Sequence, residues 1–537
     1  MTDNHEWWRS AVIYQIYPRS FADSDGDGYG DLPGVISKLP YLKELGVDAV
    51  WLSPFYRSPM ADAGYDVADY RQVDPLFGAT ADAHRLIEEA HALGLRVVID
   101  LVPNHTSDAH EWFQAAIAAE PGAPERQRYL IRDGSGPSGE LPPNNWRSLF
   151  GGEGWSRLQR PDGTPEQWYL HLFDTHQPDL DWNTEAVREG FDDILRHWLD
   201  LGVDGFRVDV AHSLIKANGL PDEDATIDRS YFNLGPMWDQ DGVHDIYRRW
   251  RKVLEEYDGD RVLVAEAWVP DPERLARYVR SDEMHQAFNF DFLTSAWDAA
   301  SYRKVITETM AANAAVGAPT TWVLSNHDVV RHATRLARED PSDTGGIAAT
   351  DPQPDAALGL RRARAATLMM LALPGSAYLY QGEELGLPEH TAVPDHLRQD
   401  PIWFRSGHQE VGRDGCRIPM PWVADAPGAG FSPNGQTWLP QPDSYAALAA
   451  DQQVGVLGST WTMYHDALRL RRESRLGAGE LAWVNAGKDV VAFDNGPVRV
   501  LVNVAGVPVP LPDGEVLLAS TDVADVLPAD AAVWLRR

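Results

Sequence analysis

The chain has 537 residues, of which 44% are hydrophobic and 24% are charged, proportions typical of a globular protein that exclude a disordered or fibrous one. Acidic residues outnumber basic residues by 80 to 47, and the formal net charge of −33 disfavours binding to nucleic acid or to anionic membranes. Cys416 is the only cysteine, which excludes an intramolecular disulfide and favours a reducing compartment. The N-terminus lacks the features of a signal peptide and no stretch is apolar enough to span a membrane, so we expect a cytoplasmic protein without membrane partners.

Short runs rich in valine, isoleucine and aromatic residues recur along the chain, and most are followed by a segment with helical periodicity. In Glu185–Leu201, for example, the apolar residues fall on one helix face and Gly202 ends the pattern. Eight strands that alternate with helices predict an α/β fold, the closed parallel (β/α)8 TIM barrel, whereas fewer strands would indicate an open sheet. The predicted strands are Val12–Ile16, Ala49–Ser53, Arg96–Val102, Gly205–Val210, Val262–Trp268, Phe288–Phe292, Thr321–Asn326 and Ala377–Gln381.

Two intervals interrupt this alternation. Residues 106–184, rich in glycine, proline, asparagine and tryptophan, are too long for one strand-to-helix link and predict an inserted B domain after the third strand. Residues 386–451 predict a second insertion near the active site, within a barrel made of residues 1–105 and 185–475. In residues 476–537, alternating runs predict a C-terminal antiparallel β domain. The clearest of these runs are Val490–Phe493, Val498–Asn503 and Glu515–Leu518.

Carboxylates stand at or just after the ends of four predicted strands, where a TIM barrel carries its catalytic groups. They are Asp100, Asp209, Glu266 and Asp328. A single carboxylate in such a place more often caps the next helix or binds loop amides, but four together make that explanation much weaker. Convergent carboxylates without an evident metal cage are typical of glycoside cleavage, in which one carboxyl group is the acid and another the nucleophile.

The neighbours of these carboxylates suggest their roles. Arg207 and Asp209 are two residues apart on one strand and face the same side, so we expect Arg207 to orient Asp209 and hold it ionised, as a nucleophile requires. Glu266 follows an apolar run, and burial is expected to raise its pKa, as suits a general acid. His105 and His327 add neutral donors.

Several segments resemble the hallmark regions of the α-amylase superfamily of glycoside hydrolases. The four regions are matched by Asp100–Ser107, Gly205–His212, Glu266–Trp268 and Ser325–Asp328. Gln177–Asn183 is similar to the signature of the α-glucosidase and oligo-1,6-glucosidase branch, and Val12–Phe21 and Gly375–Gly386 extend the resemblance over nearly the whole chain. The resemblance implies a retaining, double-displacement mechanism with Asp209 as nucleophile, Glu266 as acid/base and Asp328 as stabiliser of the oxocarbenium-like transition state.

The resemblance also implies a substrate pocket. It implies that the subsite around the cleaved glucose is completed by Asp100, His105, Arg207 and His327. Asp62 matches the residue that binds the non-reducing-end hydroxyls, Tyr65 the aromatic platform under the sugar, and Arg417 the arginine that pairs with that aspartate and closes the pocket. A surface ion pair is the alternative for Asp62 and Arg417. Phe150, Phe173 and Gln177 are further candidates, for which ordinary loop packing is the alternative.

An acidic loop at residues 23–31 resembles the first half of an EF-hand, although Gly34 stands where the EF-hand has its glutamate. Its aspartates are Asp23, Asp25, Asp27 and Asp31. A solvated acidic turn is the alternative. Similar loops in the resembled branch carry Ca²⁺ or Mg²⁺, with Tyr29 contributing its backbone carbonyl, so we expect one structural divalent cation of either kind and no organic cofactor.

The expected function is that of an exo-acting retaining α-glucosidase on small α-glucosides: maltose and short malto-oligosaccharides, with isomaltose or sucrose as further candidates. Val210, after the nucleophile, leans toward α-1,6 bonds in the resembled branch, but Ala211-His212 departs from that pattern. A transglucosylase or sucrose isomerase would use the same intermediate. A non-catalytic sugar-binding relative would lack at least one carboxylate, and none is missing. The oligomeric state stays open.

Overall fold

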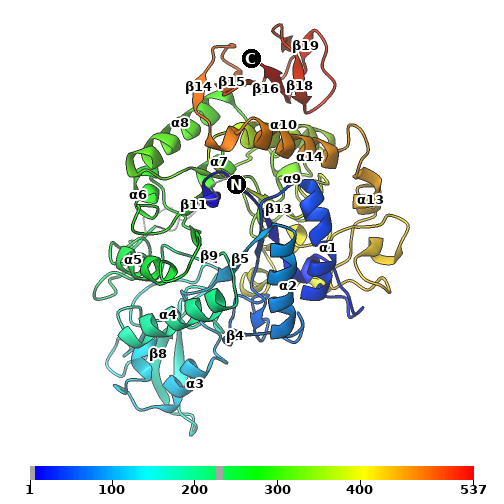
Figure 1. The fold of residues 1–537 in the computed structure, drawn as a ribbon. Helices are drawn as coiled ribbons and strands as arrows, with labels where there is room; N and C mark the ends of the chain where they lie inside the picture. The colour runs from blue at the N-terminus through cyan, green and yellow to red at the C-terminus, as the bar shows by residue number, and fades with distance from the viewer. Residues whose placement is uncertain (1–5, 225–233) are drawn as a thin grey trace.

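The computed structural model describes residues 6–224 and 234–537, and its centre is a closed barrel of eight parallel strands, as predicted (Figure 1). Around the barrel the order is β1-β13-β12-β11-β10-β9-β5-β2. Their side chains are almost wholly buried, which explains the runs of apolar residues in the sequence. The strands are β1 (Val12–Ile16), β2 (Ala49–Leu52), β5 (Arg96–Leu101), β9 (Gly205–Val208), β10 (Val262–Ala265), β11 (Gln286–Asn289), β12 (Thr321–Val323) and β13 (Ser376–Tyr380).

Amphipathic helices surround the barrel. In α4 (Glu185–Asp200) the apolar stripe that includes Phe191 and Trp198 is buried, and Gly202 adopts a φ of 99° just beyond the helix end. The other main helices are α1 (Leu32–Leu45), α2 (Thr80–Ala92), α5 (Val243–Leu254), α6 (Pro272–Arg277), α8 (Ala299–Val316), α10 (Ala356–Ala372) and α14 (Thr460–Glu473). Within residues 6–224 and 234–537, none of the helices combines the length and apolar character needed to cross a membrane.

The predicted sixth strand is wrong in its second half. Strand β11 ends at Asn289, and Phe290–Leu293 form the short helix α7, because the Asn289 side chain accepts a hydrogen bond from the Phe292 N–H and caps the helix. Other strands end one to three residues earlier than predicted. Thus β9 and β10 each end one residue before a candidate catalytic carboxylate, Asp209 and Glu266 respectively, which therefore lie at the start of loops.

The loops that shape the barrel mouth come from separate parts of the chain. Between β5 and α4, within predicted residues 106–184, lie helix α3 (Glu111–Ala118) and a three-stranded sheet in the order β6-β8-β7. These strands are β6 (Ile131–Arg132), β7 (Trp155–Gln159) and β8 (Pro165–Leu170). After β2, strands β3 (Tyr56–Arg57) and β4 (Asp69–Val73) form a small hairpin. After β13 come the short helices α11 (Pro401–Arg405), α12 (Ser444–Ala447) and α13 (Ala450–Gln453).

The C-terminal antiparallel sheet is confirmed, with five strands in the order β14-β15-β16-β20-β18. These are β14 (Leu481–Trp483), β15 (Val490–Asn495), β16 (Val498–Asn503), β18 (Val516–Ala519) and β20 (Ala531–Arg536), with β17 (Val509–Pro510) and β19 (Val526–Leu527) paired separately. Trp534 anchors the sheet to α10 by donating to the Leu368 carbonyl at 3.0 Å. In Figure 1 these strands and the inserted sheet lie at opposite ends of the molecule.

Candidate active site

Arg207 on β9 brings three of the predicted carboxylates together. Its Nη1 donates to Asp209 Oδ1 at 2.6 Å and to Asp100 Oδ1 at 2.9 Å, and its Nη2 lies 3.4 Å from Glu266 Oε2. The carboxylates come from β5 and from the ends of β9 and β10, which are neighbours in the barrel. One buried guanidinium therefore places the candidate nucleophile and the candidate acid beside each other.

Glu266 is also tied to the backbone that follows Asp209. Its Oε2 accepts a hydrogen bond from the Val210 N–H at 2.7 Å, and its Oε1 accepts one from Trp268 Nε1 at 2.8 Å. Val210 has a φ of 44°, a left-handed conformation that costs a β-branched residue about 1–2 kcal/mol. Glu266 therefore helps to hold the strained turn that follows Asp209.

Burial and the charge of Arg207 act in opposite directions on the pKa values of Glu266 and Asp209. Burial raises the pKa of Glu266, and Arg207 opposes the rise, so this prediction is confirmed. Burial also raises the pKa of Asp209, and Glu266 and Asp100 add to the rise, so Arg207, which opposes it, is the group that favours the ionised form of Asp209. One arginine faces three buried carboxylates. Since Asp209 has the shorter contact with Arg207, a shared proton is better placed on Glu266.

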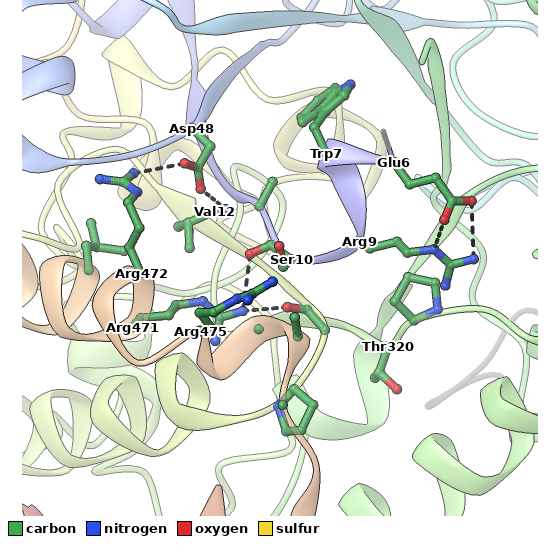
Figure 2. Close-up of a pocket in the computed structure, with 18 of the residues that line it drawn as sticks. Glu6, Trp7, Arg9, Ser10, Val12, Asp48, Thr320, Arg471, Arg472 and Arg475 are labelled. Atoms are coloured by element: carbon green, nitrogen blue, oxygen red, sulfur yellow. Dashed lines mark hydrogen bonds and ion pairs between the residues drawn. The ribbon is translucent and has the colours of Figure 1, made fainter. Parts of the chain in front are cut away.

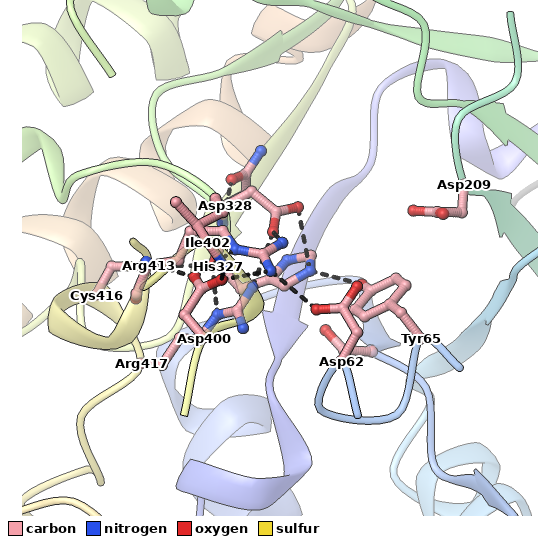
Figure 3. A network of polar contacts seen from close by, with 12 residues as sticks. Asp62, Tyr65, Asp209, His327, Asp328, Asp400, Ile402, Arg413, Cys416 and Arg417 are labelled. Carbon is pink, nitrogen blue, oxygen red and sulfur yellow. Dashed lines mark hydrogen bonds and ion pairs between the residues drawn. The ribbon is translucent and has the colours of Figure 1, made fainter. Parts of the chain in front are cut away.

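Asp328, in the loop after β12, is held by two arginines (Figure 3). Arg413 Nη1 and Arg417 Nη2 each lie 3.0 Å from its Oδ1, and His327 Nε2 lies 3.2 Å from its Oδ2. Burial alone would raise the pKa of Asp328, but His327, Arg413 and Arg417 together hold it below the usual range. Asp328 is therefore ionised and available to stabilise positive charge.

Asp62 is paired with Arg413, so the prediction that Arg417 is its partner is wrong. Arg413 Nη2 donates to Asp62 Oδ1 at 2.9 Å, while Arg417 has Asp328 as its carboxylate partner in the described part of the chain. The two arginines stand at either end of a tight turn and reach different carboxylates. Asp400, which is fully buried, fixes Arg413 by accepting from its Nε at 2.7 Å. In the sequence, Arg413 could have been found from its position four residues before Arg417. No sequence pattern pointed to Asp400.

The Tyr65 and His327 rings join the two halves of the site. They stack with their centroids 5.2 Å apart and their planes at 7°. Tyr65 Oη donates to Asp100 Oδ2 at 3.0 Å and lies 2.6 Å from His327 Nε2, while Gln15 Nε2 lies 2.7 Å from His327 Nδ1. Burial lowers the pKa of His327, so the imidazole is neutral at physiological pH.

The inserted segment supplies the remaining predicted residues. Gln177 Nε2 donates to Asp62 Oδ2 at 3.1 Å and lies 3.1 Å from His105 Nε2. The Phe173 ring contacts the His105 ring at 5.1 Å and the Phe150 ring at 5.5 Å. Burial lowers the pKa of His105 to about 4. All predicted sugar-site residues thus belong to one network of contacts.

The acidic loop brings together three of the predicted metal ligands, Asp23, Asp25 and Asp27, whose carboxylate oxygens lie within 4.8 Å of one another. Asp31 is placed differently, since its Oδ1 caps α1 by accepting from the Gly34 N–H and its Oδ2 accepts from the Ser24 N–H and hydroxyl. The Tyr29 ring packs on Trp438, with centroids 6.3 Å apart.

Comparisons with known proteins agree with this geometry. The chain matches the family model described as the alpha amylase catalytic domain over residues 15–479. It is 38% identical over 510 residues to the probable alpha-glucosidase of Rhizobium meliloti (strain 1021), with 91% of this chain and 87% of the relative covered. Among solved structures, the alpha-glucosyl transfer enzyme XgtA is 36% identical, with a TM-score of 0.84 and 99% of both chains covered. The trehalulose synthase MutB from Pseudomonas mesoacidophila MX-45 is 30% identical, with a TM-score of 0.83 and coverage of 99% of this chain and 98% of that one. The chain belongs to the α-amylase family of glycoside hydrolases.

Proposed function

We propose that the chain is an exo-acting retaining α-glucosidase that releases α-glucose from the non-reducing end of small α-glucosides. The observation that carries this proposal is the guanidinium of Arg207, which contacts both Asp209 and Glu266 and so directs a nucleophile and an acid at the same bond. In retaining enzymes the two carboxyl groups are about 5–5.5 Å apart, and sharing one guanidinium favours such a closely spaced pair.

In the first half-reaction, Glu266 gives its proton to the glycosidic oxygen while Asp209 attacks C1 of glucose. The bond between C1 and that oxygen breaks, the leaving group departs as an alcohol, and glucose is bound to Asp209 as an ester. Asp328, ionised by its two arginines, stabilises the positive charge that develops on the ring.

In the second half-reaction, the ionised Glu266 takes a proton from water, whose oxygen attacks C1, releases α-glucose and regenerates Asp209. A sugar hydroxyl in place of water would give transfer instead. A transglucosylase or sucrose isomerase is therefore the second candidate, favoured by the likeness over nearly the whole chain to an alpha-glucosyl transfer enzyme and a trehalulose synthase.

Exo action rests on the contacts of Asp62. Arg413 and Gln177 both bind its carboxylate, so the β3–β4 loop, the loop after β13 and the inserted segment meet at one point. This meeting point supports a pocket closed beyond one glucose unit, whereas an endo-acting enzyme needs an open cleft. Maltose and short malto-oligosaccharides fit such a pocket, with isomaltose and sucrose as further substrates.

Product analysis tests both candidates. The pure protein would be given maltose, isomaltose or sucrose at low and high concentration. With sucrose, whose leaving group is fructose and not a second glucose, the anomer of the first glucose released would be read by proton NMR. The proposal expects α-glucose at every concentration. First-formed β-glucose would overturn retention, and new glucosides or sucrose isomers as the main products at high concentration would favour the second candidate.

We also propose that the Asp23–Asp25–Asp27 cluster holds one structural Ca²⁺ or Mg²⁺, with the Tyr29 carbonyl as a further ligand, and that the enzyme needs no organic cofactor. The donor set supports this, since hard oxygen ligands suit both ions. Backbone N–H groups of Gly26 and Gly28 bind Asp23 at 2.7 and 2.8 Å and curl the loop around the cluster. A cytoplasmic location is part of the proposal, supported by the single, buried and unpaired Cys416.

A further inference from the structure

A second cavity, of about 820 Å³, lies at the end of the barrel where the strands begin. It is lined by Val12 at the start of β1, Arg96 at the start of β5, Gly375 just before β13 and the end of α14 (Figure 2). The catalytic carboxylates lie at the opposite ends of these strands, so this cavity is separate from the active site. Its volume is in the range usual for small-molecule sites.

The lining is strongly cationic. Its ionisable residues are the five arginines Arg9, Arg96, Arg471, Arg472 and Arg475 and the two carboxylates Glu6 and Asp48. The whole chain has a formal net charge of −33, so the positive charge of this cavity is opposite in sign to that of the protein as a whole. It therefore concentrates anions locally.

Three of the five arginines already have a carboxylate partner. The pairs are Arg9–Glu6 at 2.6 Å, Arg96–Asp204 at 2.9 Å and Arg472–Asp48 at 2.9 Å. The charges without such a partner among the described residues belong to Arg471 and Arg475, which stand side by side in Figure 2.

Arg471 is a buried cation with no carboxylate in direct contact among the described residues, and Asp48 is the carboxylate whose charge acts on it from further away. Its side chain is 4% exposed and, within the part of the chain that the structure describes, donates only to backbone carbonyls, among them those of Leu371 and Leu373 at 2.7 and 2.8 Å, while its Nε has no partner there. Burial lowers the pKa of Arg471 to about 10, which leaves it protonated at neutral pH. Carbonyl groups solvate a guanidinium but do not neutralise it, so an anion beside it would supply the missing charge.

Arg475 follows the end of α14 in a left-handed conformation, with a φ of 55°. Glycine is the usual residue at this position, and an arginine costs about 1–2 kcal/mol of backbone energy. The negative end of the helix dipole explains cations in the last turn, but it gives no reason for an arginine at the strained residue beyond it. The Arg475 side chain lines the cavity and has no hydrogen bond or ion pair within residues 6–224 and 234–537.

We propose that this cavity binds a small phosphate-bearing anion. Arg475 and Arg472 would contact the phosphate, and the buried Arg471 would attract it electrostatically without direct contact. The planar guanidinium fork matches the oxygens of phosphate, which is why arginine is the preferred partner of that group. The uncharged part of a phosphate ester would lie against the apolar lining, which includes Trp7 and Met310. This binding function is independent of the proposed glucosidase activity.

Isothermal titration calorimetry of the full-length protein tests the proposal with three probes at constant ionic strength: inorganic phosphate, glycerol 3-phosphate and, as the uncharged control, glycerol. Saturable binding of phosphate or of its ester, but not of glycerol, is expected. The relative affinity of the two phosphates tells whether the free ion or an ester is the natural ligand.

Two variants locate the binding. Arg475→Gly removes the guanidinium and suits the left-handed backbone, so the protein should fold and the dissociation constant should rise about tenfold or more. Arg469→Ala removes an arginine of the same helix that pairs with Glu473 outside the cavity, and it should bind as the parent does. Absence of saturable binding, or equal losses in both variants, would overturn the proposal.

Discussion

The carboxylate of Glu266 accepts a hydrogen bond from the N–H of Val210, the residue that follows Asp209, at 2.7 Å. Val210 is held in a left-handed conformation, so this bond stabilises the turn that positions Asp209, the proposed nucleophile. The position of Asp209 thus depends on Glu266, and both depend on Arg207. The proposed catalytic pair is therefore pre-organised before substrate arrives.

Replacement of Glu266 by glutamine should separate its two roles. Glu266→Gln keeps an oxygen for the Val210 N–H but cannot supply the proton, so kcat/KM on maltose should fall on the order of 10²–10⁴-fold. The loss should be much smaller with 4-nitrophenyl α-glucoside, whose leaving group needs no proton. Steady-state kinetics on both substrates make the comparison, and equal losses on the two would refute the acid role.

Glu266→Ala should in addition destabilise the fold. The buried Val210 N–H then loses its acceptor, which costs about 1–3 kcal/mol. Urea denaturation of the alanine and glutamine variants measures this difference, and equal stability would show that the hydrogen bond does not hold the turn.

Asp209→Asn should abolish turnover while leaving sugar binding intact. Asparagine is a poor nucleophile but fills the same space beside Arg207, so activity should fall on the order of 10⁴-fold or more. Calorimetric titration with maltose should still detect binding, and mass spectrometry with a slow fluoro-sugar substrate should find no covalent adduct. An adduct on another residue would reassign the nucleophile.

Arg413→Ala should weaken both the pocket and the fold. It leaves Asp62, Asp328 and Asp400 without a shared cation, and breaking a buried ion pair of this kind costs about 3–5 kcal/mol. The loss should appear in urea denaturation and as a lower kcat/KM. The surface pair Arg277–Asp241, in which Arg277 is half-buried and Asp241 is exposed, is the control, because Arg277→Ala should cost about 1 kcal/mol or less. Similar losses in the two variants would contradict this role of Arg413.

Asp62→Asn should change the pH dependence of stability and damage activity. Burial raises the pKa of Asp62 to about 6, although Arg413 and Arg417 oppose the rise. The folded state therefore holds this proton more tightly than the unfolded chain, and its ionisation between about pH 4 and pH 6 destabilises the fold. Between pH 4.5 and pH 8 the stability of the variant relative to the parent should therefore rise by on the order of 2 kcal/mol. Urea denaturation at both pH values measures this, and a pH-independent difference would contradict it.

Removal of the proposed cation should lower stability and leave the chemistry intact. A chelator should reduce the melting temperature, and Ca²⁺ or Mg²⁺ should restore it, with a gain of about 2.7 kcal/mol at a hundred times the dissociation constant. In Asp25→Asn the chelator effect should be smaller, because one of the three clustered carboxylates is neutral. No change in melting on chelation or on addition of either ion would indicate a solvated acidic turn.

The sequence by itself determined the barrel and the places of its candidate catalytic carboxylates. Strand and helix patterns are local, and a motif that follows a barrel strand necessarily lies at the barrel mouth, whichever loops surround it. For the same reason Asp209 and Arg207, two residues apart, were predicted to meet, and they do. The sixth strand was misplaced by a local effect, the side-chain cap of Asn289, which competes with strand propensity.

The tertiary structure alone decided which arginine meets Asp62 and how the site is charged. Arg413 and Asp62 are 351 residues apart, and the choice between Arg413 and Arg417 depends on the path of a loop that no periodic pattern describes. Asp400, which fixes Arg413, gave no signal at all in the sequence. Likewise, the pKa of Asp209 reflects burial and the sum of charges from three strands, a quantity that exists only once those strands have assembled.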